Sequence, residues 1–394
     1  MSFDGMWAAL EPVGRHPGTG GYRRYAWTGE DATLRDWFAG EAARRGLDLT
    51  TDRAGNQWAW WGDPDATPGL AIGSHLDSVP DGGAFDGPLG VVSAFAALDA
   101  LRDRDVAPGR PIAVVNFGDE EGARFGVACA GSRIITGALD PGRARGLTDA
   151  DGISMAEAMT KAGHDPAHLG RDAQTLGRVG TFVELHVEQG RALVDLDAPL
   201  AVGSGIWPHG RWRVELPGEA NHAGTTRLAD RHDPMLAFAS VVLAARVAAV
   251  RNDALATCGK VRVDPNAVNA VPSQVTGWLD ARGPSAAQVR AIVAETAEVV
   301  TGHGGIVAEE SWTDLTPFDP ALADRLARVL GDVPVLGTGA GHDAGILAAA
   351  GVPAAMLFVR NPTGVSHSPA EHADHADCLS GVAALATVIT DLTR

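Results

Sequence analysis

The stretch AIGSHLDSVPDGGAFDGPLGV, residues 71–91, decides how the chain is organised. It begins as a short apolar run, which predicts a buried strand, and continues into a loop rich in glycine and proline. The loop carries His75, Asp77, Asp81 and Asp86, and its sharp turns allow a histidine and an aspartate to face one point. An imidazole and a carboxylate that converge suit a divalent metal of the zinc or manganese type. Taken alone, the stretch also fits an ordinary surface loop with scattered polar residues.

Three other apolar segments precede polar loops in the same way. Residues 111–117 lead into GDEEG, residues 181–185 lead into HVEQG, and residues 354–359 are followed by GVSHSPAEH. Strands of open α/β sheets gather ligands at their carboxyl ends, so we expect these loops at one edge of a sheet. The candidate metal-binding or catalytic side chains in the four loops are His75, Asp86, Glu120, Glu121, His186 and His367.

Together these side chains indicate a site for two metal ions. Two histidines, a bridging aspartate, a glutamate and a further histidine can supply the ligands of two ions that share one carboxylate. Of the adjacent Glu120 and Glu121, one can bind metal while the other remains free as a general base. Each signal is weak by itself, because a lone histidine is usually a packed or surface residue and acids are common at solvated helix starts.

The bulk composition limits the class of protein. A chain of 394 residues is long enough for two domains. Its net charge of −17 argues against nucleic-acid and anionic-membrane partners. The three cysteines are far apart in the sequence, which fits a reduced cytoplasm better than a disulfide framework. We see no signal peptide, and no uninterrupted apolar run approaches the ~20 residues that span a bilayer.

The segment 210–312 differs from the rest and predicts a second domain. Its patterns follow the order strand, helix, strand, strand, helix, strand, which predicts a small antiparallel sheet with helices on one face. We therefore expect an α+β domain inserted into an α/β domain that is formed by residues 1–209 and 313–394. The larger domain is expected to contain a mixed sheet with helices on both faces.

Eight motifs give the chain a recognisable resemblance. In order, they are GSHLDSVPDGGAFDGPLGV, FGDEEGARFG, ELHVEQG, NHAGTT, PNAVNAVP, LDAR, GAGHDAG and GVSHSPAEH. In these motifs the chain resembles the N-carbamoyl-L-amino-acid hydrolase and allantoate amidohydrolase family. That family is a branch of the two-metal aminoacylases and carboxypeptidases. In ELHVEQG the third residue, His186, stands where many of the peptidases have a carboxylate.

The resemblance implies a role for each candidate in the larger, catalytic domain. One metal would be bound by His75, Asp86 and His186, and the other by Asp86, Glu121 and His367. Glu120 would be the base, and Asp77 would lie behind His75 and fix its tautomer. The cofactors would be two divalent ions per subunit, zinc or manganese, with cobalt or nickel as further options.

The resemblance also implies where the substrate is held. In the inserted domain, His222 would polarise the scissile carbonyl and Asn269 would bind substrate. Arg282 would pair with the substrate carboxylate. Without the resemblance, a surface salt bridge would be the simpler interpretation of this arginine. In the larger domain, Gln189 would contact the substrate or the metal-binding loop, and Arg360 would line the substrate pocket. His342 and Asp343 would lie behind the metal ligands or face the substrate. Hinge closure would bring the inserted domain, a lid, to the metals. Members of the family form homodimers through this domain.

The expected activity is metal-dependent hydrolysis of a linear C–N bond in an N-carbamoyl (ureido) acid, with release of ammonia and CO2. Candidate substrates are N-carbamoyl-L-amino acids, allantoate, ureidoglycolate and β-ureidopropionate. Two alternatives remain open, namely a dipeptidase or aminoacylase of the same two-metal group and a non-catalytic binding protein on the same fold. The second alternative would be expected if metal ligands were missing, and all five are present.

Overall fold

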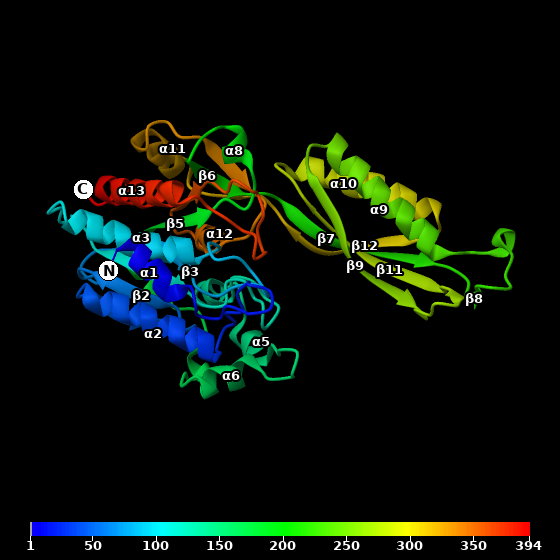
Figure 1. Cartoon of the computed structure of the whole chain (residues 1–394), viewed down its shortest axis with the longest axis horizontal. Helices are drawn as coiled ribbons and strands as arrows, with labels where there is room; N and C mark the ends of the chain where they lie inside the picture. Colours follow the sequence, from blue (N-terminus) through cyan, green and yellow to red (C-terminus); the bar gives the residue numbers. More distant parts are fainter. Residues whose placement is uncertain (1) are drawn as a thin grey trace. The chain divides into compact units, whose positions relative to one another are not determined.

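The computed structural model describes residues 2–394, which form two compact units. Unit 1 comprises residues 2–205 and 317–394, and unit 2 comprises Ile206–Thr316. From the sequence we expected the inserted domain to span residues 210–312. In the structure, unit 2 begins at residue 206 and ends at residue 316. Figure 1 colours the chain from its N-terminus to its C-terminus, and unit 1 contains both ends.

Unit 1 contains a nine-stranded sheet with the order β1-β2-β4-β3-β5-β15-β6-β13, in which β14 also pairs with β6. Parallel pairing joins β4, β3, β5 and β15, whereas the pairs β1/β2, β2/β4 and β15/β6 are antiparallel. The strands are β1 (Asp48–Thr51), β2 (Gln57–Trp61), β3 (Gly69–His75), β4 (Ile112–Phe117), β5 (Val179–Val187), β6 (Leu200–Ile206), β13 (Thr316–Pro317), β14 (Val335–Thr338) and β15 (Ala354–Val359). The four parallel strands therefore present their carboxyl ends at one edge of the sheet.

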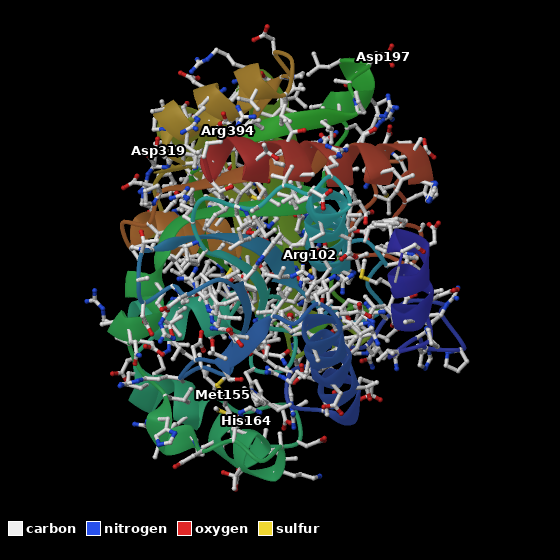
Figure 2. The ribbon with its side chains drawn as sticks, turned by 90° about the vertical axis from the view of Figure 1, so that its left-hand side faces the viewer. Arg102, Met155, His164, Asp197, Asp319 and Arg394 are labelled. Carbon is white, nitrogen blue, oxygen red and sulfur yellow. The ribbon has the colours of Figure 1, made fainter. Side chains whose placement is uncertain are left out.

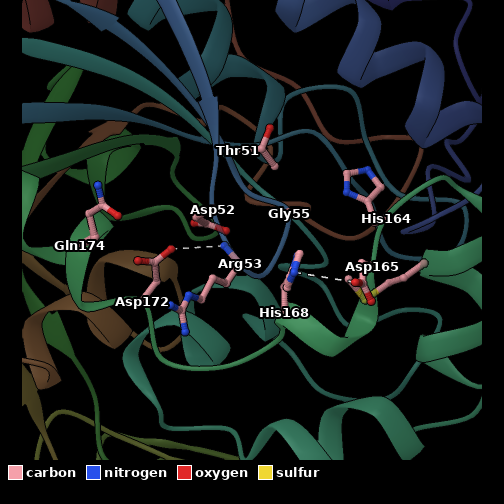
Figure 3. A pocket seen from close by; sticks show the side chains of 10 residues that line it. Thr51, Asp52, Arg53, Gly55, His164, Asp165, His168, Asp172 and Gln174 are labelled. Atoms are coloured by element: carbon pink, nitrogen blue, oxygen red, sulfur yellow. Dashed lines mark hydrogen bonds and ion pairs between the residues drawn. The ribbon is translucent and has the colours of Figure 1, made fainter.

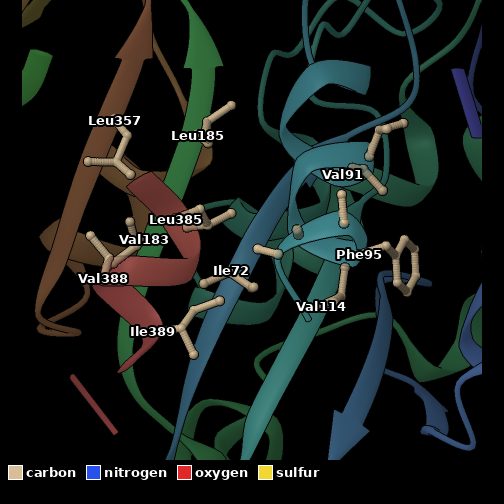
Figure 4. Close-up of a cluster of buried hydrophobic side chains, with 14 of the residues drawn as sticks. Ile72, Val91, Phe95, Val114, Val183, Leu185, Leu357, Leu385, Val388 and Ile389 are labelled. Carbon is tan, nitrogen blue, oxygen red and sulfur yellow. The ribbon is translucent and has the colours of Figure 1, made fainter. Parts of the chain in front are cut away.

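Helices cover one face of this sheet and bury a large apolar core against it. They are α1 (Phe3–Leu10), α2 (Gly29–Arg44), α3 (Pro88–Arg102), α11 (Pro320–Val329) and α13 (His375–Leu392). In Figure 4, Phe95 of α3 and Ile389 of α13 lie on the same side of the strands as Ile72 and Val183. Each of these side chains is fully buried, which stabilises the fold by about 1.5–3 kcal/mol per residue.

The start of α3 fixes the loop of residues 76–87 beside the core. Gly87, the residue before the helix, has a left-handed φ of 81°, and Pro88 occupies the first turn, where its missing N–H costs nothing. A Cβ at Gly87 would lie 2.5 Å from ring atoms of His75. Glycine is therefore needed at position 87 for the helix to begin directly beside this histidine.

Shorter helices lie in the connections between β4 and β5, between β5 and β6, and between β14 and β15. They are α4 (Ala130–Thr136), α5 (Pro141–Gly146), α6 (Met155–Lys161), η1 (Pro166–His168), α7 (Ala173–Arg178), α8 (Ala192–Asp195) and α12 (Asp343–Ala349). Of these, α12 contacts β5 and β15 but contributes no residue to the core cluster described above. In Figure 2, Met155 and His164 mark the α6 region at the opposite end of the view from Asp319, which precedes α11.

Unit 2 has a four-stranded antiparallel sheet with the order β12-β7-β11-β9. Its elements are β7 (His209–Pro217), β8 (Asn221–His222), η2 (Leu228–Asp230), α9 (Pro234–Arg251), β9 (Leu255–Asp264), β10 (Ala270–Val271), β11 (Gln274–Arg282), α10 (Ala286–Gly302) and β12 (Ile306–Thr313). The predicted order of strands and helices is confirmed, with a small additional sheet formed by β8 and β10. Both long helices pack on the four-stranded sheet.

Within residues 2–394, one helix is long and apolar enough to cross a membrane when judged by length and composition alone. This helix is α9. Part of its surface packs on the sheet of unit 2 through Ala237, Val241, Ala245 and Ala248. A helix that covers the core of a water-soluble domain meets the same criteria, so the finding is weak evidence for a membrane.

Two helical glycines of unit 1 provide a matched test of packing. Gly40→Ala is expected to stabilise the protein by about 1 kcal/mol through helix propensity, since nothing lies within 4 Å of the added Cβ in α2. Gly90→Ala is expected to destabilise it by about 1–3 kcal/mol, since the Cβ would lie 2.2 Å from the carbonyl oxygen of Leu185. Urea unfolding of both variants measures the difference. Equal effects would contradict this close approach of α3 to β5.

Candidate metal centre and active site

The carboxyl ends of β3 and β5 bring together a first group of possible metal ligands. His75 is the last residue of β3, His186 lies at the end of β5, and Asp86 comes from the loop before α3. Asp86 Oδ1 lies 3.5 Å from His75 Nε2 and 3.0 Å from His186 Nε2. One ligand atom from each residue lies within 4.8 Å of the others, and all three residues are buried.

A second group shares Asp86 with the first. It contains Glu121, which follows β4, and His367, which follows β15. His367 Nε2 lies 3.5 Å from Asp86 Oδ2 and 3.7 Å from Glu121 Oε2. Asp86 therefore presents one carboxylate oxygen to each group, which is the geometry of a carboxylate that bridges two cations.

The first group contains two buried nitrogen atoms that lack a hydrogen-bond partner. In residues 2–394, neither His75 Nε2 nor His186 Nε2 has a partner with acceptable geometry. Their Nδ1 atoms lie 3.2 Å from the carbonyl oxygen of Asp77 and 2.8 Å from that of Val187. A proton on each Nδ1 would leave two Nε2 lone pairs directed toward a carboxylate, a donor set that fits a divalent cation.

Asp77 connects two of the loops that carry the candidate residues. Its carboxylate accepts the backbone N–H groups of Glu120, at 3.2 Å, and Glu121, at 3.0 Å. Its Oδ1 also lies 3.4 Å from His75 Nδ1. The loop after β3 and the loop after β4 are therefore held together directly behind the first group.

Glu120 is buried beside both groups but belongs to neither. Its Oε1 lies 3.2 Å from the thiol of Cys129, which can donate a hydrogen bond, and its Oε2 lies 3.9 Å from His75 Nε2. Burial raises the pKa of Glu120 well above its usual value, and the nearby Asp343 and Glu121 add to this increase. This carboxyl group therefore has a high proton affinity and remains available for proton transfer.

The accumulated negative charge also affects the possible ligands. Burial, followed by the charge of Asp86, raises the pKa of Glu121 to about 8. Burial opposes protonation of His186, but the adjacent Asp86 outweighs it and raises the pKa of this histidine to about 8. So many buried acids in contact require either protons or cations, and two divalent ions would supply the missing positive charge.

The backbone around the centre is strained at several positions. His367, Asp119 and Cys129 all have positive φ angles, between 54° and 55°, although none is glycine. Asp81, also in the first loop, has a φ of 57° and pairs with Arg23, so the structure places it outside both groups. Left-handed residues of this kind cost about 1–3 kcal/mol each and are concentrated at functional sites.

Of the other predicted site residues of unit 1, three lie near the metal-ligand groups and one points toward α13. Gln189 Nε2 donates to Asp86 Oδ2 at 2.9 Å, so this amide contacts the shared carboxylate. The buried His342 lies with its ring centroid 4.5 Å from that of His186, and the buried Asp343 accepts a hydrogen bond from Ser132. The guanidinium of Arg360 instead donates to Asp377, 2.8 Å away, which directs it toward α13.

The predicted site residues of unit 2 lie at two opposite ends of its four-stranded sheet. His222 in β8 pairs in register with Ala270, and the N–H of Ala223 donates to the carbonyl oxygen of Asn269, so His222 and Asn269 lie close together. Arg282 is at the other end of the sheet, where β11 finishes opposite His209. Its guanidinium forms a two-pronged ion pair with Asp280.

The nine residues of β11 separate these two places. At about 3.3 Å per residue the strand is about 26 Å long. The β8/β10 pair lies beyond the Gln274 end, because β8 follows the end of β7 and β10 precedes the start of β11. Figure 1 shows β8 at this end of unit 2. His222 and Arg282 of one chain therefore cannot contact the same small molecule while the sheet keeps this structure.

Sequence reasoning missed two residues that contact the centre. Ser366 Oγ lies 3.4 Å from Asp86 Oδ2, and Glu371 accepts the backbone N–H of Asp86. Both occur in the GVSHSPAEH motif on either side of His367. Their position in that motif was the available signal.

A separate pocket in unit 1 contains none of the predicted site residues. Figure 3 shows it between the loop after β1 and the η1 region, where Asp52, His164, His168 and Asp172 line it. Among residues 2–394, the only groups of three or more side chains arranged to hold a metal are the two that share Asp86. The candidate centre is therefore the one at the edge of the sheet.

The fold and the site define the class of this protein. Residues 71–391 match the model of peptidase family M20/M25/M40, and the chain belongs to this family.

Named relatives resemble the chain over nearly its whole length. An N-carbamoyl-L-amino acid amidohydrolase of Geobacillus stearothermophilus is 37% identical over 98% of this chain and 96% of its own. The allantoate amidohydrolase of Escherichia coli K12 is 32% identical over 97% and 95%. The crystal structure of a hydantoinase/carbamoylase family amidase from Burkholderia ambifaria has a TM-score of 0.85 and 31% identity, over 100% of this chain and 97% of that one.

Proposed function

We propose that the protein is a metal-dependent amidohydrolase that cleaves a linear C–N bond of an N-carbamoyl (ureido) acid, such as an N-carbamoyl-L-amino acid or allantoate. One observation supports this proposal above all others, namely that Asp86 directs one oxygen to each of two possible ligand groups while Glu120 lies beside both groups and belongs to neither. The names of the relatives above support the substrate class. Three free cysteines fit the proposed cytoplasmic location.

His75, Asp86 and His186 would hold one ion, and Asp86, Glu121 and His367 the other. When bound, two divalent ions such as zinc or manganese would polarise the scissile carbonyl and activate the attacking water. Glu120 accepts the proton of that water and then delivers it to the leaving nitrogen. Its buried position and raised proton affinity suit a group that must gain and then release a proton.

His222 is proposed to stabilise the negative charge that develops on the carbonyl oxygen. The backbone N–H of Gly224 donates to His222 Nδ1 at 3.0 Å. In a neutral ring the proton must then lie on Nε2, which becomes the hydrogen-bond donor. A donor fixed in this way is suited to an oxyanion. Asn269, close to His222, would bind another polar group of the same substrate.

Arg282 is proposed to bind the substrate carboxylate, with Asp280 holding its guanidinium fork in place. Because His222 and Arg282 of one chain lie at opposite ends of β11, we infer that the residues around one substrate come from two subunits. A homodimer through unit 2 would satisfy this requirement.

The surface of α9 is consistent with such a dimer. Leu236, Leu243, Val247 and Val250 recur along one side of the helix, and each residue exposes between 55% and 70% of its surface. Leu243→Glu is expected to convert a dimer into monomers and to lower activity, because a buried unpaired charge would destabilise the interface. Light scattering after gel filtration measures the mass. Leu379→Glu, at an exposed leucine of α13, is the control, and a monomeric unaltered protein would contradict the assignment.

A substrate panel tests the proposed activity. Metal-reconstituted protein is incubated with allantoate, ureidoglycolate, several N-carbamoyl-L-amino acids and a dipeptide, and ammonia and free amino acids are measured. Ammonia release from at least one ureido acid is expected. Hydrolysis of the dipeptide without ammonia from any ureido acid would favour a dipeptidase and overturn the proposal.

A further inference from the structure

Glu371 is a buried carboxylate at the junction of two loops of unit 1. Only 5% of its surface is exposed, although it lies in the segment 360–374, which contains neither helix nor strand. This segment also carries His367, whereas the loop before α3 carries Asp86. Nothing in the regular structure of the sheet fixes the distance between these two side chains.

The hydrogen bonds of Glu371 join the two loops. Its Oε2 accepts the backbone N–H of Phe85 at 2.9 Å and that of Asp86 at 3.0 Å. Its Oε1 lies 3.4 Å from Ser366 Oγ, the hydroxyl of the residue before His367. The same hydroxyl lies 3.4 Å from Asp86 Oδ2. One carboxylate thus connects the backbone that carries Asp86 to the turn that carries His367.

Gly83 provides the space that this connection needs. A Cβ at position 83 would lie 2.2 Å from Glu371 Oε2 and 2.4 Å from Glu371 Cβ. Distances below 3.0 Å force one of the two groups to move. The first loop therefore accommodates the Glu371 side chain only because residue 83 has no side chain of its own.

We propose that Glu371 is a positioning residue for the second ion, which it serves by setting the separation of Asp86 and His367. The proposal rests on the proposed function, because it takes these two residues as metal ligands. The first ion depends less on Glu371, because His75 and His186 are held by β3 and β5, which pair directly with each other. Loss of Glu371 should therefore affect the two ions unequally.

Titration of the metal-free protein with Mn²⁺ in a calorimeter tests whether loss of Glu371 weakens the binding of one ion more than that of the other. The unaltered protein is expected to bind two equivalents. In Glu371→Ala one of the two equivalents should bind about 10–100-fold less tightly, the usual effect of removing a group that orients a ligand, while the other stays near its original affinity. Glu371→Gln should lie between the two, because its amide oxygen can still accept both backbone N–H groups.

Asp172→Ala is the matched control. Asp172 is also a buried carboxylate, and it joins two segments by accepting the backbone N–H groups of Arg53 at 3.3 Å and Thr175 at 3.0 Å, but it belongs to neither ligand group. Its loss is expected to lower the unfolding temperature and to leave both Mn²⁺ affinities unchanged. Gly83→Ala provides a second route, since it displaces Glu371 without removing it, and the same selective weakening is expected.

The outcomes separate the two proposals. If the unaltered protein binds fewer than two equivalents, the two-ion assignment fails, and the role of Glu371 fails with it. If the unaltered protein binds two and Glu371→Ala binds both with unchanged affinity, only the role of Glu371 is overturned. If Glu371→Ala does not fold, Gly83→Ala decides, because selective weakening supports the role and unchanged binding overturns it.

Discussion

Glu120→Gln is expected to bind two divalent ions with nearly unchanged affinity and to lose about 10²–10⁴-fold in kcat on any ureido substrate that the protein accepts. The amide has the shape of the carboxyl group, and Glu120 lies outside both ligand groups, so the metal centre should persist. An amide, however, cannot accept the proton of the attacking water. Metal analysis after dialysis, combined with single-turnover assays, measures both properties in the same sample.

The adjacent Glu121 provides the control. Glu121→Gln changes the same atoms one residue further along the chain, but this side chain faces His367 and belongs to the second group. It should therefore weaken one equivalent of metal, and excess metal should restore part of its activity. Substantial turnover by Glu120→Gln, or rescue of that variant by metal, would contradict its assignment as the base.

Asp86→Ala is expected to abolish binding of both ions. Each of its oxygens faces a different group, so one substitution removes a ligand from both and takes away the carboxylate oxygen that lies 3.0 Å from His186 Nε2. The metal content should fall from two equivalents to near zero after dialysis. Activity should disappear with it, since without the ions no cation activates the attacking water.

His367→Ala is the comparison for this effect, because it removes a ligand from the second group only. It should retain one equivalent, bound through His75, Asp86 and His186. Circular dichroism of each variant shows whether the sheet is intact. An Asp86→Ala protein that is folded and still holds one tightly bound ion would show that this carboxylate does not bridge two sites.

Much of the larger domain could be predicted from local patterns. Strands β3, β4, β5 and β15 are short apolar runs that end in polar loops, and their parallel pairing brings the loops to one edge. Two residues that contact the centre could not be assigned in this way. Ser366 and Glu371 contact Asp86 across 280 and 285 residues of sequence, and no local pattern specifies such a contact.

Other features depend on tertiary packing. The connection between β4 and β5 contains several helices of six or seven residues, too short for a periodic apolar pattern to be distinctive. In unit 2 the order of strands and helices could be predicted from the sequence. The distance between His222 and Arg282 could not, because it follows from the register of β11 with its neighbouring strand. Arg360 could not be placed either, because its partner Asp377 lies on a helix that follows the motif.

The left-handed residues at the edge of the sheet have a consequence for the protein without its ions. His367, Asp119 and Cys129 hold unfavourable backbone angles in loops, whereas the strands beneath them are fully buried and regular. Bound cations would hold these loops against their tendency to relax. Removal of the ions with a chelator should therefore increase the mobility of these loops first. Amide hydrogens of the loops should then exchange with solvent long before those of the central strands.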